Sequence, residues 1–272
     1  MCATCGCGAD HEHAHDHDHD HGHDHDHVHP HEHGHHDHSD ADRVRTIRLE
    51  RDLLAKNARL AAENRRRFAE QRVAIFNLIG SPGAGKTALL EAVVPRLKGA
   101  LPLGVLEGDQ ATDYDAKRIE RAGGRALQIN TGTGCHLDAS MIETGVRGLD
   151  VPRESVVFVE NVGNLVCPAL FDLGETAKIV VMSVTEGEDK PRKYPHVFRA
   201  AQLFVLTKID LQPMVRLDQE RCFAFARQVN PDLQILRVSA TSGQGIDAFC
   251  TWIQTEATRA FCDARSATTV TP

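Results

Sequence analysis

The chain has 272 residues, a formal net charge of −7 at pH 7 and 41% hydrophobic residues, which allows one large domain or two small ones. No basic stripe marks a nucleic-acid-binding protein, and no apolar run reaches the roughly 18 residues that a membrane-spanning helix needs. Because the first ten residues also lack the positive and apolar regions of a secretory signal, we expect a cytoplasmic protein. In that reducing compartment, eight cysteines favour metal ligands and buried thiols over disulfides.

The chain begins with three closely spaced cysteines, Cys2, Cys5 and Cys7, in the pattern C-x-x-C-G-C. Three thiolates at this spacing can close around one soft or borderline divalent ion. The α-amino group of Met1 is near enough to be a fourth ligand, and such a set suits square-planar Ni²⁺ better than tetrahedral Zn²⁺. The alternative is an exposed tail whose thiols bind nothing.

From His11 to His38, the sequence is a nearly alternating run of histidine with aspartate or glutamate. Such a segment has almost no apolar side chains to bury, so we predict that residues 1–42 form a disordered tail. Its neutral imidazoles are able to bind several Ni²⁺, Zn²⁺ or Cu²⁺ ions. The irregular spacing and the interleaved acids argue against an engineered tag and favour storage or buffering of a transition metal.

Residues 43–72 are predicted to form one helix, with Asp42 as its N-cap. Four apolar residues recur at intervals of seven positions: Ile47, Leu54, Ala61 and Phe68. This spacing puts them on one helix face, which we expect to dock on the following domain or on a partner.

The next stretch, residues 80–87, reads G-S-P-G-A-G-K-T and matches the phosphate-binding pattern G-x-x-x-x-G-K-S/T. An apolar run at 73–79 precedes it and a helical pattern at 88–94 follows it, as the motif requires. The glycines let backbone N–H groups point at a polyphosphate, and the following helix adds partial positive charge. We predict phosphate contacts for Gly80, Gly83, Gly85, Lys86 and Thr87, with the Thr87 hydroxyl also holding Mg²⁺.

Apolar runs then recur, separated by helix-compatible segments such as 111–121 and 217–229. The runs lie at 103–107, 126–129, 155–159, 178–182, 203–206 and 233–238. This alternation predicts an α/β P-loop NTPase with a mostly parallel sheet flanked by helices over 73–265, followed by a flexible C-terminus at 266–272. Ligands of such sheets bind at the carboxyl ends of the strands.

Three residues at strand ends are candidates for the hydrolysis of a nucleoside triphosphate. Asp109 follows the second strand and could hold Mg²⁺ opposite Thr87, although a helix N-cap is the alternative. Glu160 and Gly163 form E-x-x-G, where nucleotide hydrolases have D-x-x-G, and the Gly163 N–H would bind the γ-phosphate. Whether Glu160 contacts Mg²⁺ or orients the attacking water stays open.

Two later strand ends predict recognition of guanine. Thr207-Lys208-Ile209-Asp210 resembles the N-K-x-D element of GTPases, with Thr in place of Asn. The Asp210 carboxylate can accept from guanine N1–H and its 2-amino group, which adenine cannot supply. Ser239 and Ala240 begin an S-A-T element that would contact guanine O6 through a backbone N–H, so GTP is favoured over ATP.

A second metal site is predicted inside this domain. Cys135 and His136 follow the strand at 126–129, and Cys167 follows the strand at 155–159, so their side chains could converge. Two thiolates and one imidazole suit Zn²⁺ or Ni²⁺, with water or another subunit completing the set. The alternative is a pair of buried cysteines beside a surface histidine. Three further cysteines read as core or surface thiols: Cys222, Cys250 and Cys262.

These motifs together resemble one family. The cysteine-rich start, the His-rich tail, G-S-P-G-A-G-K-T, G-T-G-C-H-L-D, E-N-V-G-N-L-V-C-P and S-V-T-E-G-E-D-K-P are similar to HypB, the GTPase that delivers nickel in NiFe-hydrogenase maturation. The resemblance covers essentially the whole chain. It implies a tight nickel site at Cys2, Cys5 and Cys7, and a weaker nickel or zinc site near a dimer interface at Cys135, His136 and Cys167.

The resemblance also implies a homodimer that closes around GTP and Mg²⁺, with contacts near Leu211 and Val215. The partners would be HypA and the hydrogenase large subunit, with slow hydrolysis because no arginine finger or catalytic glutamine is evident. Some members carry more histidines after the Cys-His pair, where this chain has Asp138, Ser140 and Thr144. The rival interpretations are a urease-accessory nickel GTPase, a nickel or zinc storage protein with a lapsed GTPase, and a small-molecule kinase.

Overall fold

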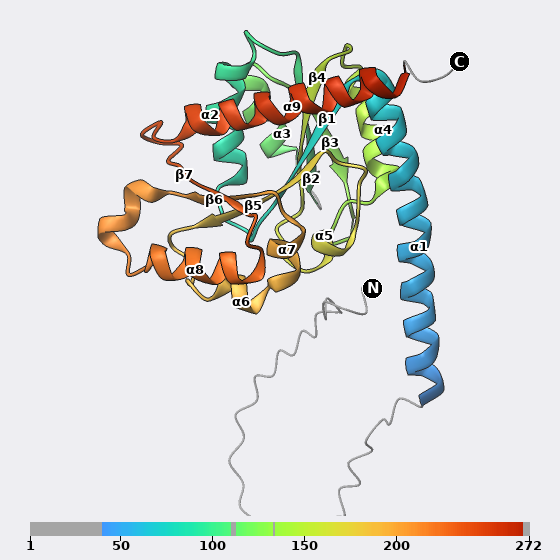
Figure 1. Ribbon diagram of the computed structural model, residues 1–272, viewed down its shortest axis with the longest axis horizontal. Coiled ribbons are helices and arrows are strands. Elements are labelled where there is room, and N and C mark those ends of the chain that lie inside the picture. Colours follow the sequence, from blue (N-terminus) through green and yellow to red (C-terminus); the bar gives the residue numbers. More distant parts are fainter. Residues whose placement is uncertain (1–39, 110–112, 133, 269–272) are drawn as a thin grey trace, which may run out of the picture.

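The computed structural model describes residues 40–109, 113–132 and 134–268 (Figure 1). The predicted nickel ligands Cys2, Cys5 and Cys7 and the histidine-rich stretch from His11 to His38 lie outside the described residues. Their roles therefore stay predictions from the sequence.

Seven parallel strands form one sheet in the order β3-β2-β4-β1-β5-β6-β7. The strands are β1 (Val73–Ile79), β2 (Leu103–Asp109), β3 (Arg125–Asn130), β4 (Ser155–Glu160), β5 (Ala177–Ser183), β6 (Leu203–Thr207) and β7 (Gln234–Arg237). The central strands β1 and β4 are buried at every position, because helices cover both faces of the sheet. The predicted fold class, a parallel sheet flanked by helices, is confirmed.

Helices cover the two faces of the sheet in two layers. One layer contains α2 (Lys86–Leu97), α3 (Tyr114–Arg121) and α9 (Ile246–Thr268). The other contains α1 (Asp40–Gln71), α4 (Ala139–Leu149), α7 (Pro195–Ala200) and α8 (Gln219–Val229). In Figure 1, α2 and α9 lie above the strands, α7 and α8 below them, and α1 and α4 to the right. Alternate residues of β1 serve the two layers: Phe76 packs with α2 and α9, and Ile75 packs with α1 and α4.

Three short elements complete the described structure: α5 (Cys167–Leu170), α6 (Lys190–Lys193) and the 3₁₀ helix η1 (Ile209–Met214). Helix α9 continues to Thr268, past the expected domain end at residue 265. Helix α3 begins at Tyr114, whereas the expected helix began at 111, and residues 110–112 lie outside the described part. Among the described residues, no helix combines the length and the apolar character that crossing a membrane demands.

Helix α1 begins at Asp40, so Asp42 lies inside the helix and the expectation that it is the N-cap is wrong. The helix runs without interruption from Asp40 to Gln71 and so includes residue 42. Of the expected apolar face, Ala61 and Phe68 are buried against the domain. The N-terminal half of α1 projects away from the sheet, and Leu53 there is 52% exposed (Figure 1).

Candidate functional site

The phosphate-binding loop joins β1 to α2 and has the backbone that its glycines predict. Gly83 and Gly85 have φ angles of 74° and 90°, in the region that favours glycine. Glycine is required at position 80 for a different, steric reason, because a Cβ there would lie 2.4 Å from the carbonyl oxygen of Val181 on the neighbouring strand. Lys86 is buried, and its Nζ donates to the Gly80 carbonyl over 3.3 Å, so the ammonium group bridges the two ends of the loop.

A cavity of about 1070 Å³ opens above this loop. Its lining includes the predicted phosphate and magnesium residues and one predicted metal ligand: Gly83, Gly85, Lys86, Thr87, Asp109, Glu160, Gly163 and Cys135. These residues come from the ends of β1, β2 and β4 and from the loop after β3, which meet at one edge of the sheet. The strand order therefore gathers segments far apart in the sequence around one space.

The oxygen groups beside Thr87 fit a magnesium ion. The Thr87 hydroxyl donates to Glu160 Oε1 over 2.9 Å, and the Lys86 Nζ lies 3.9 Å from the same oxygen. The other oxygen, Glu160 Oε2, is buried, and within the described part of the chain its one potential donor is the adjacent carboxyl group of Glu107. With Asp109 on the same wall, this gives a set of hard oxygen donors of the kind that Mg²⁺ prefers.

Glu107 is a buried acid that the sequence analysis did not assign to the site. It lies opposite Glu160 in the register of β2 and β4. Burial, together with the charge of Glu160, raises the pKa of Glu107 to about 10. Glu107 is therefore protonated near neutral pH and can donate to Glu160. The sequence gives one indication of it, because Glu107 directly follows the buried residues 103–106 of β2 and is itself almost fully buried.

The loop after β4 packs directly on the phosphate-binding loop. A Cβ on Gly163 would lie 2.8 Å from Pro82 Cγ and 3.0 Å from Pro82 N. Only glycine lets the two loops approach this closely. Asp109 is not the N-cap of the helix that follows it, because α3 starts at Tyr114 with Asp113 before it.

A smaller cavity of about 330 Å³ adjoins the first and shares Gly85 and Lys208 with it. Its lining gathers most of the predicted guanine-reading residues: Thr207, Lys208, Asp210, Ala240 and Thr241. Lys208 Nζ donates to the Gly83 carbonyl over 2.7 Å, and Thr207 Oγ1 donates to the Ala84 carbonyl over 2.6 Å. Thr207, where GTPases have Asn, thus still braces the phosphate-binding loop.

Ser239 does not line this cavity. It is fully buried, and its hydroxyl oxygen accepts from the Ser242 N–H over 3.0 Å, which stabilises the turn that carries Ala240. Ser239 therefore stabilises this turn, and its part in binding guanine stays a prediction.

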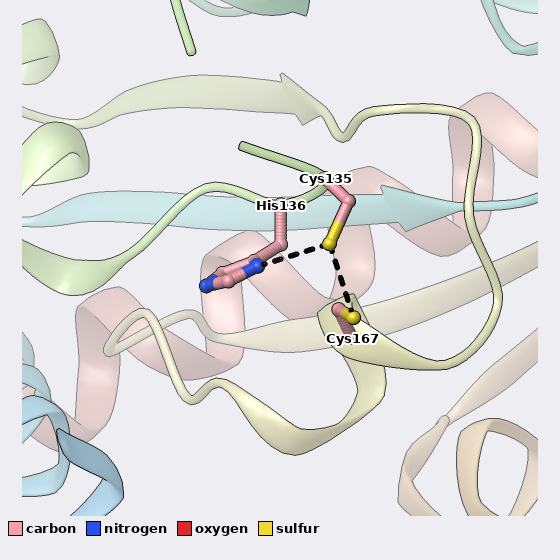
Figure 2. A group of neighbouring side chains, drawn as sticks. All are labelled: Cys135, His136 and Cys167. Carbon is pink, nitrogen blue, oxygen red and sulfur yellow. Dashed lines mark hydrogen bonds between the residues drawn. The ribbon is translucent and has the colours of Figure 1, made fainter. Parts of the chain in front are cut away.

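Cys135, His136 and Cys167 converge, as Figure 2 shows. The Cys135 Sγ lies 3.1 Å from Cys167 Sγ and 3.7 Å from His136 Nδ1, and all three ligand atoms lie within 4.8 Å of one another. A tetrahedral ion with ordinary zinc bond lengths would separate two sulfurs by about 3.8 Å and a sulfur from a nitrogen by about 3.6 Å. A small opening of the two thiols would therefore admit an ion.

The imidazole of His136 is prepared for metal binding. Burial lowers its pKa, partly opposed by the charge of Asp138, so the ring is neutral near pH 7. Its face packs on the Phe171 ring, with 3.8 Å between the ring centroids. Asp138 caps α4 by accepting from the Met141 N–H over 2.9 Å. Among the described residues, these three are the one group of three or more His, Cys, Asp or Glu side chains whose ligand atoms converge closely enough to share an ion.

Other residues at or near the cavities were not foreseen. Arg118, Asp115 and Tyr194 line the large cavity, and Arg118 forms ion pairs with Glu91 and Asp115. No motif marks them, because their positions depend on how α3 and the segment after α6 pack.

The remaining cysteines lie apart from the site. Burial raises the pKa of Cys222 to about 12, which leaves it an inert core thiol. Cys250 is also buried, whereas Cys262 is exposed on α9.

The sequence is similar to a known family of nucleotide-binding proteins. Residues 74–237 match the family described as "CobW/HypB/UreG, nucleotide-binding domain". The chain is 53% identical over 212 residues to the hydrogenase maturation factor HypB of Escherichia coli, covering 78% of this chain and 73% of that protein.

Two solved structures are similar in fold. HypB from Archaeoglobus fulgidus superimposes with a TM-score of 0.69 at 37% identity, over 75% of this chain and 99% of that one. HypB from Helicobacter pylori, solved in complex with nickel, gives a TM-score of 0.71 at 32% identity, over 76% and 97% of the two chains. The chain therefore belongs to the HypB hydrogenase maturation factors of the CobW/HypB/UreG family.

Proposed function

We propose that this protein is a GTP-hydrolysing nickel metallochaperone that binds, stores and delivers Ni²⁺ to the large subunit of NiFe-hydrogenase in the cytoplasm. The observation that carries the proposal is that Cys135 lines the same cavity as Lys86, Thr87 and Gly163. A thiolate of the metal site and the phosphate-binding residues thus border one space. The names of the related maturation factors and the nickel in the Helicobacter pylori structure support it.

Binding of GTP would follow from groups already in position. The glycine backbone, Lys86 and the start of α2 would hold the phosphates, and Asp210 with Lys208 and Ala240 would hold guanine. Mg²⁺, held by Thr87 and the neighbouring carboxylates, would neutralise phosphate charge when bound.

Hydrolysis would depend on groups near the γ-phosphate. Gly163 would offer its N–H to that phosphate, and Glu160 would contact the ion or orient the attacking water. Glu107 would hold a proton against Glu160, which favours the ionised state of Glu160. We expect slow turnover.

Transfer of nickel would depend on the short stretch of chain that joins the phosphate site to the metal site. Cys167 is four residues beyond Gly163 in the chain. Loss of the γ-phosphate would relax the loop at Gly163 and change the geometry at Cys135, His136 and Cys167. Nickel would then pass to HypA or the hydrogenase large subunit, from a homodimer that GTP closes. Zn²⁺ is a second ion that this donor set would accept.

The decisive experiment is titration of the full chain with Ni²⁺ and Zn²⁺ in the presence of GDP and of a non-hydrolysable GTP analogue. We expect the affinity of one class of site to differ between the two nucleotides. If the metal affinities are the same with both nucleotides while GTP is hydrolysed, the protein is a GTPase with a metal-binding tail and the proposed coupling is wrong. Tight nickel binding without hydrolysis would favour the storage protein instead.

A further inference from the structure

Strand β1 carries a fully buried amide that neither the phosphate site nor the metal site uses. Asn77 lies inside the otherwise apolar run Val73–Ile79 and has 0% exposure. A buried amide costs free energy unless its polar atoms are hydrogen-bonded. Its partners are two buried residues from distant segments, Asn161 and Glu175.

Asn161 stands between the two proposed sites. It follows Glu160 directly, lines the large cavity and is 1% exposed. Its Oδ1 accepts from the N–H of Leu137 over 3.2 Å and from the N–H of Val162 over 3.1 Å. Leu137 is the residue after His136, so one side chain bonds the loop that bears Gly163 and the loop that bears two of the metal ligands.

The chemistry fixes which way the amides face. Backbone N–H groups only donate, so the Asn161 atom that faces Leu137 and Val162 must be its oxygen. Its Nδ2 must then face Asn77, where it donates to Oδ1 over 3.2 Å. The Asn77 Nδ2 in turn donates to Glu175 Oε1 over 3.2 Å. Each amide orients the next, and the hydrogen bonds all run in one donor-to-acceptor direction, from Asn161 to Asn77 to Glu175.

This series of hydrogen bonds continues to the other side of the metal site. Lys178 Nζ lies 3.5 Å from Glu175 Oε1 and donates to the carbonyls of Ala169 and Phe171, each over 3.3 Å. Phe171 packs on the His136 ring, and Ala169 belongs to the short helix α5 that begins at Cys167. The buried network therefore touches the segments that carry all three metal ligands.

We propose that Asn161, oriented by Asn77, is the positioning residue that transmits the nucleotide state of the cavity to the Cys135–His136–Cys167 site. The inference rests on the proposed function and adds the residue through which its two sites communicate. When the backbone after Glu160 moves, the Asn161 amide moves with it and shifts the Leu137 N–H, and so the His136 ligand beside it. The effect is on the nucleotide dependence of metal affinity rather than on metal binding itself.

The chain offers a matched control on α1. Asn64 is also a buried asparagine, with 2% exposure. Its Nδ2 donates to the carbonyls of Ala139 and Leu173, over 2.7 Å and 3.0 Å, and so holds the same two segments from the outside. It makes none of the hydrogen bonds that join Asn161 to Asn77 or Leu137. Asn64→Ala therefore loosens the metal-bearing segments without cutting the proposed connection.

The test uses the full chain with Cys2, Cys5 and Cys7 replaced by serine. With the exposed Cys262 also replaced by serine, thiolate-to-nickel charge-transfer absorption reports Cys135 and Cys167, because the histidine-rich tail contributes no thiolate and Cys222 and Cys250 are buried. Ni²⁺ is titrated against a competing chelator with saturating GDP and with saturating non-hydrolysable GTP analogue. The quantity measured is the ratio of the two nickel affinities.

In the parent chain we expect a ratio of about fivefold or more. Asn161→Ala should bring the ratio close to one, and Asn77→Ala should also lower it severalfold, while Asn64→Ala keeps the parent ratio. If Asn161→Ala does not fold, Asn77→Ala decides, since Asn77 does not line the cavity. The inference is overturned if both variants keep the parent ratio, or if Asn64→Ala removes it equally.

The two proposals fail in different ways. If the two nickel affinities of the parent chain are equal, the result contradicts the proposed coupling of GTP to nickel and, with it, the proposed role of Asn161 and Asn77. If the nickel affinities of the parent chain differ between the two nucleotides, and the difference stays in Asn161→Ala and Asn77→Ala, the result contradicts only the role of these two asparagines.

Discussion

Glu107 and Glu160 lie directly opposite each other on the adjacent strands β2 and β4, and both carboxyl groups are buried. Two ionised carboxylates buried side by side would repel each other strongly, so the pair holds a proton. Burial raises the pKa of Glu160 as well, but the nearby charge of Lys86 opposes that rise. The proton therefore belongs mainly to Glu107, and the negative charge faces Thr87 and the phosphate-binding loop.

Glu107→Gln should change how stability depends on pH. The pKa of Glu107 is about 10 in the folded protein and near its ordinary value of 4.5 when unfolded. Between these values the folded state keeps a proton that the unfolded state releases, so wild-type stability falls as pH rises through this window. Glutamine does not titrate, so the stability of the variant relative to wild type should rise by on the order of 1 kcal/mol per pH unit.

Denaturant unfolding at pH 6 to 9, followed by the fluorescence of the single tryptophan, Trp252, measures this difference. Glu70→Gln is the control, because the Glu70 side chain is 59% exposed on α1. A constant difference between Glu107→Gln and wild type over this range would contradict the shared proton.

Gly163→Ala should slow hydrolysis of GTP more than it weakens nucleotide binding. The added Cβ would lie 2.8 Å from Pro82 Cγ, so the loop after β4 must move away from the phosphate-binding loop. Because misplacement of a catalytic group by about 1 Å can cost about 100-fold in rate, we expect kcat to fall by about 10-fold or more. Single-turnover kinetics and GDP titration separate the two effects.

Gly99→Ala is the matched control for this variant, because nothing lies within 4 Å of a Cβ at Gly99. Unchanged kcat in Gly163→Ala would mean that close packing of the two loops is not needed for the reaction.

Lys86→Ala should remove most GTP hydrolysis. The Lys86 ammonium is the buried cation beside Glu160 and the phosphate-binding loop. Loss of one group that stabilises developing charge lowers rates by about 100- to 1000-fold. Phosphate release assays on this variant, with the exposed Lys98→Ala of the same segment as control, give the measurement. Full activity in Lys86→Ala would refute the phosphate assignment.

Asp210→Asn should relax the preference for guanine. The carboxylate lines the smaller cavity and is proposed to accept from two guanine donors, whereas an amide presents a donor to one of them. An unmatched polar group in such a site costs enough to lower GTP affinity by at least about 100-fold. Competition with xanthosine triphosphate, which has an acceptor in place of the 2-amino group, should improve in the variant. GTP and xanthosine triphosphate affinities that both stay at wild-type values would show that Asp210 does not read the base.

Replacing Cys2, Cys5 and Cys7 by serine should abolish the tightest Ni²⁺ binding and leave GTP hydrolysis near wild type. Cys135→Ser with Cys167→Ser should have a different result, the loss of the nickel site whose affinity depends on the nucleotide. Chelator competition on both variants, with the exposed Cys262→Ser as control, measures the division of roles. The opposite pattern would contradict it.

Much of the site was readable from short stretches of sequence. The phosphate-binding loop, the E-x-x-G element and the Thr207–Asp210 element each depend on neighbouring residues, and the alternation of strands and helices placed them at strand ends. The same reasoning did not connect Glu107 with Glu160 or assign Arg118 to the cavity, since neither residue belongs to a local pattern. It also began α1 too late, because the residues before 43 continue the helix.

The sequence by itself determined the types of chemical group: thiols, imidazole, carboxylates, and the backbone of a phosphate-binding loop. Only the tertiary structure decided which of them meet. Strand β4 lies between β2 and β1, and this order sets Glu107 beside Glu160 and Asn77 beside Asn161. It also brings the loops after β3 and β4 together, so that Cys135 and Cys167 touch. Such contacts depend on long-range strand pairing, which local residue patterns do not encode.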